Sequence, residues 1–492
     1  MTSPSTEDDR AAAAHPTLPD RRRSWQPAER PFTSRAEGRP ARRPNVVFIL
    51  ADDLGWGDLG SYGSLHNTTP VLDRLAADGI RFSHGYAASP TCSPTRIALY
   101  TGRYPGRLPA GLQEPLVSRD SRHGLPPEHP TLASRLRDVG YRTAMIGKWH
   151  CGWLPWFSPI RSGFEEFFGN FDGVLDYFSH IGSTGRPDLY EGEVPVEQTG
   201  YYTEIISDRA ADFVRRQDAD TPFYLQLNYT APHWPWEGPQ DLAVSAAVTK
   251  AADSDARRAL FHLEGGSLHT YRLMVEALDD GVGTVLRALD DGGLRDDTIV
   301  IFASDNGGER FAFLWPFVGE KGDCEEGGIR VPLLVRWPSA IDAGQCSDLP
   351  VITMDWTATI LDAARADAHP AYPLDGTSLL PWLVAGEPAP KRDLLWRTRE
   401  QGAVRRGPHK LVVDREAKPS RWYARRATGR QVRLYDVSVD AREQADLHRR
   451  LPDLTAELLA VWERFDQALL PYPAASTAIA PSAPGRPPGW AD

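Results

Sequence analysis

Apolar residues along the middle of the chain fall into two patterns that alternate. One pattern is a short continuous run rich in β-branched residues, as at 45–50, where Asn-Val-Val-Phe-Ile-Leu has no polar alternation. Such a run is typical of a strand that is buried on both faces. Comparable runs predict further strands at 141–146, 223–228, 298–303 and 331–337.

The other pattern is a helical spacing of apolar residues, which predicts amphipathic helices. Thr69-Pro70 and Thr131 are typical helix starts, and Gly79 and Gly140 are typical helix ends. The longest stretch of this kind covers 271–289. Strands that alternate with helices in this way predict an α/β domain built around a large, mostly parallel sheet.

Beyond residue 385 the pattern changes. Short alternating segments follow at 394–397, 403–405, 410–413 and 431–435, and helical spacing returns at 454–469. This is typical of a smaller α+β domain. We therefore divide the chain into a disordered N-terminal tail at 1–43, a large α/β domain at 44–385, a C-terminal α+β domain at 386–470 and a Pro/Ala-rich tail at 471–492.

The charge of the chain limits what it can bind. Lys and Arg together number 55, Asp and Glu number 66, and the net charge is −11. An acidic chain is not built for bulk attraction to nucleic acid or to an anionic membrane, so we expect no nucleic-acid partner. If the ligand is an anion, its receptor must be a local cluster of cations.

The sequence favours a reducing compartment. No apolar run is long enough to span a bilayer, and the N-terminus has no apolar stretch typical of a secretory signal. The four cysteines are too few for a disulfide framework in a chain of 492 residues. We therefore expect the protein to act in the cytoplasm.

Acidic residues end two of the predicted strands. Asp52 and Asp53 follow the strand at 45–50, and Asp305 and Asn306 follow the strand at 298–303. The carboxyl ends of parallel strands meet at one sheet edge, where bare carboxylates would repel each other unless a cation joined them. Oxygen ligands favour Ca²⁺ or Mg²⁺ over zinc. The alternative is that each acid only caps the turn that follows it.

A cysteine lies where a helix is expected to begin. In Cys92-Ser-Pro94-Thr-Arg96, Pro94 suits the first helical turn, which puts Cys92 at the helix N-terminus. The unpaired N–H groups there suit an anion or a reactive sulfur, and Arg96 adds a permanent cation. A single cysteine is nevertheless more often an inert buried side chain.

Four further polar residues follow predicted strands or lie in a glycine-bearing loop. Lys148 and His150 come after one strand, His233 after another, and Lys321 lies in the loop 319–332. Such side chains can grip an oxyanion and move a proton, although each alone is more often a surface or core group. Together with the acidic cluster they indicate metal-assisted hydrolysis of a sulfate or phosphate ester.

Two of these segments match family signatures. Cys92-Ser-Pro94-Thr-Arg96, followed by Thr101-Gly102, resembles the Cys-x-Pro-x-Arg signature of the sulfatase family, within the alkaline-phosphatase-like superfamily. The segment 140–150 resembles the second signature of that family, and Tyr100 is the one departure in the first, where an aliphatic residue is more usual. The resemblance runs from about residue 45 to about 380, and more loosely to 469.

The resemblance implies a fold, a cofactor and a set of roles. The fold would be a mostly parallel sheet sandwiched by helices, with a smaller C-terminal α+β domain. Cys92 would be oxidised to formylglycine by the formylglycine-generating enzyme, and its hydrate would attack sulfur. The implied roles are Ca²⁺ binding by Asp52, Asp53, Asp305, Asn306 and the modified Cys92, orientation by Arg96, charge stabilisation by Lys148 and Lys321, leaving-group assistance by His233 or Lys321, and proton removal by His150.

The resemblance leaves the substrate open. It implies a small sulfated substrate, either an aryl or a carbohydrate sulfate. A phosphonate monoester or phosphodiester hydrolase with the same nucleophile is the first alternative, and a non-catalytic anion-binding homologue is the second. No role follows for Asp279-Asp280, and the aromatic stretch from Trp149 to Phe157 suits either a substrate ring or the core.

Overall fold

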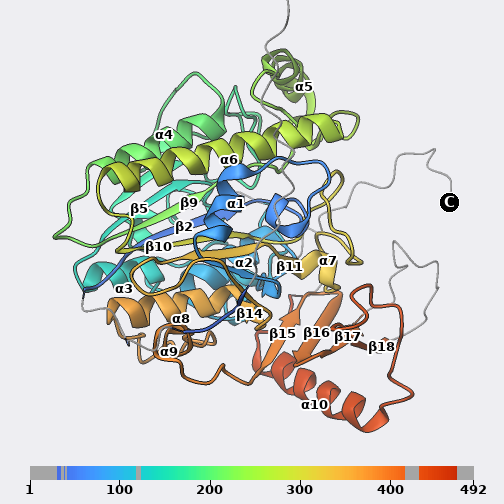
Figure 1. Ribbon diagram of the computed structural model, residues 1–492. Helices are drawn as coiled ribbons and strands as arrows, with labels where there is room; N and C mark the ends of the chain where they lie inside the picture. The colour runs from blue at the N-terminus through green and yellow to red at the C-terminus, as the bar shows by residue number, and fades with distance from the viewer. Residues whose placement is uncertain (1–29, 35–37, 39–41, 118–122, 416–430, 474–492) are drawn as a thin grey trace, which may run out of the picture.

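The computed structural model describes residues 30–34, 38, 42–117, 123–415 and 431–473 (Figure 1). Most of the two tails predicted at 1–43 and 471–492 therefore lies outside the described residues.

One piece of the predicted N-terminal tail is structured. Arg30–Pro31 form strand β1, which pairs in parallel with β13, Gln345–Ser347. The N–H of Phe32 donates to the carbonyl of Cys346 at 3.0 Å, and its ring packs against Trp382 with centroids 4.0 Å apart. A tail assigned from polar composition alone misses this one aromatic anchor.

The central sheet is large and mostly parallel, as predicted. Within the described residues it has eleven strands, in the order β1-β13-β3-β12-β10-β2-β9-β5-β6-β7-β8. The run from β10 through β2, β9 and β5 to β6 is parallel throughout. The remaining bounds are β2 Asn45–Ala51, β3 Ile80–Phe82, β5 Arg142–Gly147, β6 Glu166–Gly169, β7 Tyr190–Glu191, β8 Val194–Pro195, β9 Phe223–Asn228, β10 Thr298–Ser304 and β12 Leu333–Arg336.

Helices cover both faces of this sheet (Figure 1). Val47 and Ile49 of β2 face one hydrophobic core, and Val46 and Phe48 face the other, so alternate side chains of one strand supply both cores. The first core is closed by α1 Pro70–Ala77, α4 Tyr202–Arg215 and α6 Leu268–Asp291, and the second by α2 Cys92–Thr101, α3 Leu132–Asp138, α8 Thr353–Ala364 and α9 Leu380–Ala385. α5, Leu242–Phe261, lies beyond the first layer.

The single strand predicted at 331–337 is wrong. Pro332 separates β11, Arg330–Val331, from β12, and the two belong to different sheets. Proline has no N–H to donate to a sheet, so the ladder breaks there. β11 pairs instead with β4, Gly85–Tyr86, in a small sheet completed by β14, Val351–Ile352.

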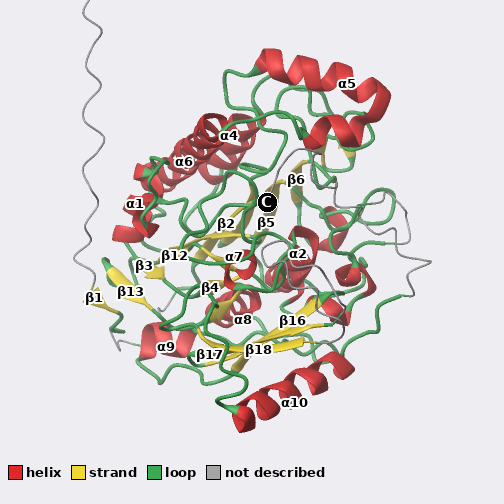
Figure 2. Cartoon of the chain, turned by 90° about the vertical axis from the view of Figure 1, so that its right-hand side faces the viewer, coloured by secondary structure: helices red, strands yellow, loops and turns green. Residues whose placement is uncertain are grey.

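The C-terminal unit is a separate antiparallel sheet, as predicted. Strands β15 Asp393–Arg397, β16 Gln401–Arg406, β17 His409–Asp414 and β18 Gln431–Asp436 pair in chain order, and α10, Pro452–Ala468, packs against them (Figure 2). On its other side the indole N–H of Trp396 donates to the carbonyl of Ala87 at 2.8 Å, so the unit is joined to the large domain through buried side chains.

The remaining short elements are η1 Gly60–Tyr62, η2 Pro105–Arg107, η3 Pro109–Leu112, η4 Ile160–Ser162 and α7 Glu326–Ile329. In the described part of the chain, no helix has both the length and the apolar character that crossing a bilayer requires.

Candidate active site

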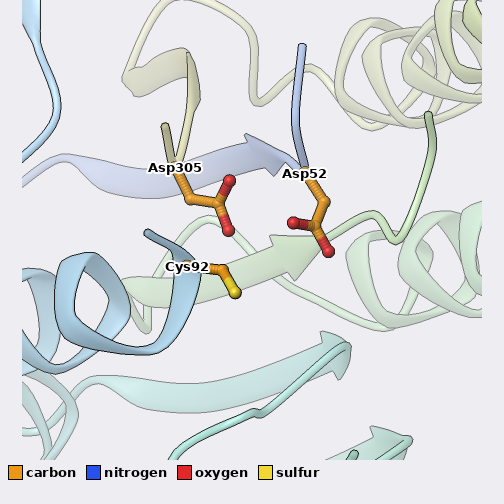
Figure 3. A group of neighbouring side chains, drawn as sticks. All are labelled: Asp52, Cys92 and Asp305. Atoms are coloured by element: carbon orange, nitrogen blue, oxygen red, sulfur yellow. The ribbon is translucent and has the colours of Figure 1, made fainter. Parts of the chain in front are cut away.

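Two neighbouring strands bring the predicted acids together. β2 and β10 pair in parallel with Ala51 opposite Ser304, so Asp52 and Asp305 leave the sheet at the same level. Both side chains are completely buried. Figure 3 shows the two carboxylates converging, with Cys92 reaching toward them from the start of α2. The sheet edge therefore gathers these residues as the sequence predicted.

The donor set fits a hard divalent cation. Ligand atoms of Asp52, Cys92 and Asp305 lie within 4.8 Å of one another, as do those of Asp52, Asp53 and His233. Among the described residues, Asp52 Oδ1 has no hydrogen-bond partner although it is buried. Asn306 Oδ1 is likewise buried and has no hydrogen-bond partner among these residues. Buried polar atoms without partners are costly, and a bound cation would satisfy both.

Two nearby cations stabilise the ionised form of Asp52. Lys148 Nζ makes an ion pair with Asp52 Oδ2, and Arg96 Nη2 lies 3.6 Å from the same oxygen. Burial favours the neutral form of Asp52, but Lys148 and the other cations nearby outweigh it and hold its pKa well below the usual range. Asp52 is therefore ionised.

The other two carboxylates are less strongly compensated. Asp53 accepts hydrogen bonds from Lys321 Nζ and Asn306 Nδ2, each at 2.6 Å. Burial nevertheless raises its pKa to about 7, with Asp52 adding to the rise. Burial likewise raises the pKa of Asp305 to about 6. A divalent cation among these groups would favour their ionised forms.

Arg96 is locked in place. Its Nε and Nη2 both donate to Asp305 Oδ2, at 3.0 and 2.8 Å, and Nη1 donates to the carbonyl of Lys148 at 3.2 Å. The side chain is completely buried. Through these three hydrogen bonds the guanidinium links the end of β10 to the end of β5 and fixes the distance between them.

The expectation that the Cys92 thiol is reactive is wrong, because burial raises its pKa. Cys92 is the first residue of α2, as predicted, but the side chain is 1% exposed. Burial raises the pKa of the thiol to about 11, and Lys148 and Lys321 only partly offset this. With its pKa raised this far, the unmodified side chain is a protonated thiol at neutral pH.

Lys148 leaves β5 through a tight turn. Its N–H donates to the carbonyl of Asn228 at 3.0 Å, and Asn228 Nδ2 donates back to the carbonyl of Lys148 at 2.7 Å. Gly147 has a φ of 103°, and a Cβ there would lie 1.9 Å from the Asn228 carbonyl oxygen. The turn thus requires glycine. Asn228 is a supporting residue that the sequence did not reveal.

His150 has a defined tautomer. Its Nε2 lies 2.8 Å from the carbonyl oxygen of Leu116, which can only accept, so Nε2 carries the proton. Burial holds the pKa of His150 well below its usual value, so the ring is neutral. Nδ1 is buried with no hydrogen-bond partner among the described residues. It is therefore available to accept a proton.

His233 also has its donor nitrogen occupied. Nδ1 donates to the carbonyl of Trp234 at 2.6 Å, and Nε2 lies 3.6 Å from Asp53 Oδ2. Burial and the charge of Lys321 hold its pKa well below the usual range. In this neutral state Nε2 presents a lone pair to the site, not a proton.

Lys321 is the most exposed of the three cations at the site. Its backbone N–H donates to the carbonyl of Gly308 at 3.1 Å, which ties the loop to the end of β10. The side chain is 13% exposed, whereas Asp53, which it contacts, is 1% exposed. Burial lowers the pKa of Lys321, but Asp53 and other acids outweigh it and hold the pKa well above its usual value. The ammonium is therefore charged.

Most of the unassigned aromatic stretch is core. Trp149 is completely buried and stacks on Tyr100, with centroids 5.2 Å apart, and Trp153 is also buried. Trp156 is exposed. Asp279 also has a structural role, because its two carboxylate oxygens accept from the N–H groups of Val71 and Leu72 at the start of α1.

Comparisons with protein families agree with this geometry. A family model described as Sulfatase matches residues 44–366. A second model, described as N-sulphoglucosamine sulphohydrolase, C-terminal, matches residues 321–461, a range that joins the Lys321 loop to the C-terminal sheet.

Several named proteins are similar to the chain over most of their length. Arylsulfatase J of Mus musculus is 30% identical over 88% of this chain and 77% of that protein, and N-acetylgalactosamine-6-sulfatase of Homo sapiens is 33% identical over 76% of this chain and 72% of that protein. A crystal structure of Ps i-CgsB in complex with k-i-k-neocarrahexaose is 30% identical, with a TM-score of 0.74 over 86% of this chain and 93% of that one.

Proposed function

The chain belongs to the sulfatase family, whose members hydrolyse sulfate esters of carbohydrates or aryl groups, and we propose how it carries out this reaction. In this proposal the nucleophile is a formylglycine made from Cys92, and a bound Ca²⁺ assists it. The observation that carries the proposal is the convergence of Asp52, Cys92 and Asp305 within 4.8 Å. Three cations surround this group in a chain whose net charge is −11.

The state of the thiol supports oxidation of Cys92. A thiol whose pKa is raised to about 11 is a weak nucleophile at neutral pH, so the unmodified cysteine is poorly suited to attack sulfur. Formylglycine in its hydrated form supplies a hydroxyl nucleophile and a second hydroxyl through which sulfate is released. We propose that the formylglycine-generating enzyme reads the Cys92-to-Arg96 segment before the chain folds, because the folded segment is buried.

The ligands proposed for Ca²⁺ are Asp52, Asp53, Asp305 and Asn306. Oxygen ligands of this kind suit Ca²⁺ better than zinc. The cation would supply positive charge next to the sulfate oxygens. Once Cys92 is oxidised, the group no longer offers sulfur, which removes the ligand that zinc would prefer.

The cationic side chains divide the remaining work. Arg96 is held by Asp305 and orients the residue at position 92. Lys148 pairs with Asp52 and Lys321 pairs with Asp53, and the two ammonium groups stabilise charge on the sulfate oxygens.

Two proton transfers are proposed. His150 accepts the proton of the second hydroxyl of the hydrate, which lets the C–O bond to sulfate break; it does so at Nδ1, the nitrogen left free by the Leu116 hydrogen bond. Lys321 is the better donor to the leaving oxygen, because its ammonium is charged, whereas neutral His233 presents only a lone pair. Once the leaving oxygen is protonated, His233 Nε2 can accept a hydrogen bond from the departing alcohol.

Direct assay tests the reaction class. Protein produced together with the formylglycine-generating enzyme and supplied with Ca²⁺ is assayed on an aryl sulfate, a 6-sulfated N-acetylgalactosamine and an aryl phosphonate monoester. We expect inorganic sulfate to be released from at least one of the two sulfates. Faster turnover of the phosphonate than of either sulfate would instead favour the phosphonate hydrolase alternative.

The metal assignment has its own test. Asp305→Asn keeps the size of the side chain and a neutral partner for Arg96, but removes a ligand charge. We expect the variant to stay folded, to bind Ca²⁺ at least about tenfold more weakly and to lose activity in proportion. Calorimetric titration measures the affinity. Stoichiometric zinc in active wild-type enzyme, measured by elemental analysis, would contradict the Ca²⁺ assignment.

A further inference from the structure

A buried ion cluster lies at the far end of the loop that carries Lys321. Glu326, the first residue of α7, is completely buried. Its Oε2 accepts from the hydroxyl of Tyr86 at 2.7 Å and pairs with Arg330 at 3.1 Å. Its Oε1 pairs with Lys410 Nζ at 2.9 Å. One carboxylate thus ties the loop to the small sheet of the large domain and to β17.

The C-terminal unit supplies the rest of this cluster. Lys410 is completely buried and also pairs with Glu443 at 3.0 Å. Glu443 Oε2 accepts from the backbone N–H of Glu326 at 2.7 Å. The start of α7 is therefore held twice from the C-terminal unit, once through its side chain by Lys410 and once through its main chain by Glu443.

The cluster is expensive as a device for stability. Moving an ammonium and two carboxylates out of water costs several kcal/mol per ion, and well-packed apolar residues often stabilise a fold at least as well. Two other hydrogen bonds hold the middle of the loop: Gly322 N–H donates to the carbonyl of Pro90 at 2.8 Å, and Cys324 N–H donates to Gln401 Oε1 at 2.9 Å. What the cluster adds is a defined position for Glu326 at the start of α7, where the loop ends.

That position matters at Lys321. Only four residues separate Lys321 from Glu326, and Lys321 Nζ lies 2.6 Å from Asp53 Oδ2. The loop packs tightly on itself, since Gly327 N–H donates to the carbonyl of Val318 at 2.7 Å. A shift of α7 would be passed to Lys321, because displacements in a close-packed region are transmitted and not absorbed.

We propose that Lys410 is a positioning residue for the active site: by holding Glu326 and Glu443, it sets the place of the Lys321 ammonium. The C-terminal unit then takes part in catalysis without contact between Lys410 and the substrate. This inference rests on the role of Lys321 proposed above.

The test is the kinetics of Lys410→Met, which keeps the apolar stem and removes the ammonium. We expect kcat/KM to fall about tenfold to a hundredfold, mainly in kcat, because misplacing a catalytic group by ~1 Å costs this much. The variant is expected to fold, since Arg330 still compensates Glu326 and Glu443, whose pKa burial already raises to about 7, can take up a proton. If it does not fold, Lys410→Met with Glu443→Gln replaces it.

Arg392→Met is the matched control. Arg392 pairs with the fully buried Asp355, so its loss also strands a buried carboxylate. The other hydrogen bonds that the structure describes for the Asp355 carboxylate come from Ile352 and Thr377, outside the loop at 319–329. We expect this variant to lose stability and to keep kcat/KM within about twofold of wild type. An equal loss of activity in Arg392→Met would show that the effect of Lys410 is merely structural and would overturn the proposal.

A crystal structure of Lys410→Met gives a second readout. We expect Lys321 Nζ to have moved away from Asp53 Oδ2; an unchanged contact, or wild-type kinetics, would also overturn the proposal. Lys321→Met distinguishes the proposed role of Lys321 from the proposed positioning role of Lys410. Wild-type activity in Lys321→Met refutes the role of Lys321 itself, whereas activity lost in Lys321→Met but kept in Lys410→Met refutes only the positioning role.

Discussion

Burial controls the chemistry of Cys92 more than the helix that begins there. A helix N-terminus stabilises a thiolate by a modest amount, typically below 1 kcal/mol at exposed sites, whereas full burial is worth several times as much. The outcome here is a pKa of about 11 for the Cys92 thiol. A residue that is inert as synthesised therefore has to be converted before it can react.

Replacement of Cys92 tests this directly. Cys92→Ser and Cys92→Ala should fold like wild type, because each changes one small group, yet both should lose turnover. Mass spectrometry of the wild-type peptide that contains residue 92 should show an aldehyde in place of the thiol. Cys346→Ala, at a half-buried cysteine on β13, is the control and should stay active. High activity in protein that carries only unmodified Cys92 would refute the formylglycine mechanism.

The position of His150 depends on a glycine. A Cβ on Gly173 would lie 2.4 Å from both Cε1 and Nε2 of the His150 ring. Gly173→Ala should therefore push the ring away from the Leu116 carbonyl and lower kcat about tenfold or more, while Ca²⁺ binding stays unchanged. Steady-state kinetics with a parallel calcium titration checks this. An unaltered kcat would mean that His150 is not the base.

Strands and helices could be predicted where the local pattern of apolar residues is distinctive. β2 and β10 were predictable because continuous apolar runs mark strands buried on both faces, and the acids that follow them mark the sheet edge. The break at Pro332 was missed because apolar residues on both sides hide it. The helix α8 was missed as well, since it is almost entirely buried and lacks an amphipathic pattern.

Long-range partners of the site could not be predicted. His150 depends on the carbonyl of Leu116, and Glu326 depends on Lys410, 84 residues further along the chain. A carbonyl carries no sequence signal, and a lysine in an alternating strand is indistinguishable from one that faces solvent. The residues that touch the acidic cluster were therefore predictable, whereas those that hold them in place were not.

Asp279 illustrates such a partner and gives a prediction. It lies on α6 and accepts from the N–H groups of Val71 and Leu72, which are orphan donors at the start of α1. Asp279→Ala should lower the free energy of unfolding by about 1–3 kcal/mol, because it leaves buried donors unsatisfied. Asp280→Ala, at the exposed neighbour, should change it by less than about 0.5 kcal/mol. Chemical denaturation compares the two, and equal losses would contradict the capping role.

For the whole molecule, the local charge of the site opposes the charge of the chain. The chain has a net charge of −11, so an anionic substrate is repelled on approach. The site contains three acids, Asp52, Asp53 and Asp305, which pair with three cations, Arg96, Lys148 and Lys321. When all six are ionised their charges cancel. The side chains alone therefore give the site no excess positive charge with which to hold an anion.

A divalent cation changes that balance, which predicts linked binding. With Ca²⁺ present the site gains two positive charges, so inorganic sulfate, the product, should bind and raise the melting temperature. After chelation the same sulfate concentration should give a much smaller shift, because Lys148 and Lys321 stay paired with Asp52 and Asp53. A ligand at a hundred times its Kd stabilises the folded state by about 2.7 kcal/mol, which a thermal melt resolves easily.

Chloride at matched ionic strength controls for general salt effects. Because binding linkage is reciprocal, sulfate should also tighten Ca²⁺ binding by the same factor, and equal sulfate shifts with and without Ca²⁺ would place the anion outside the cluster.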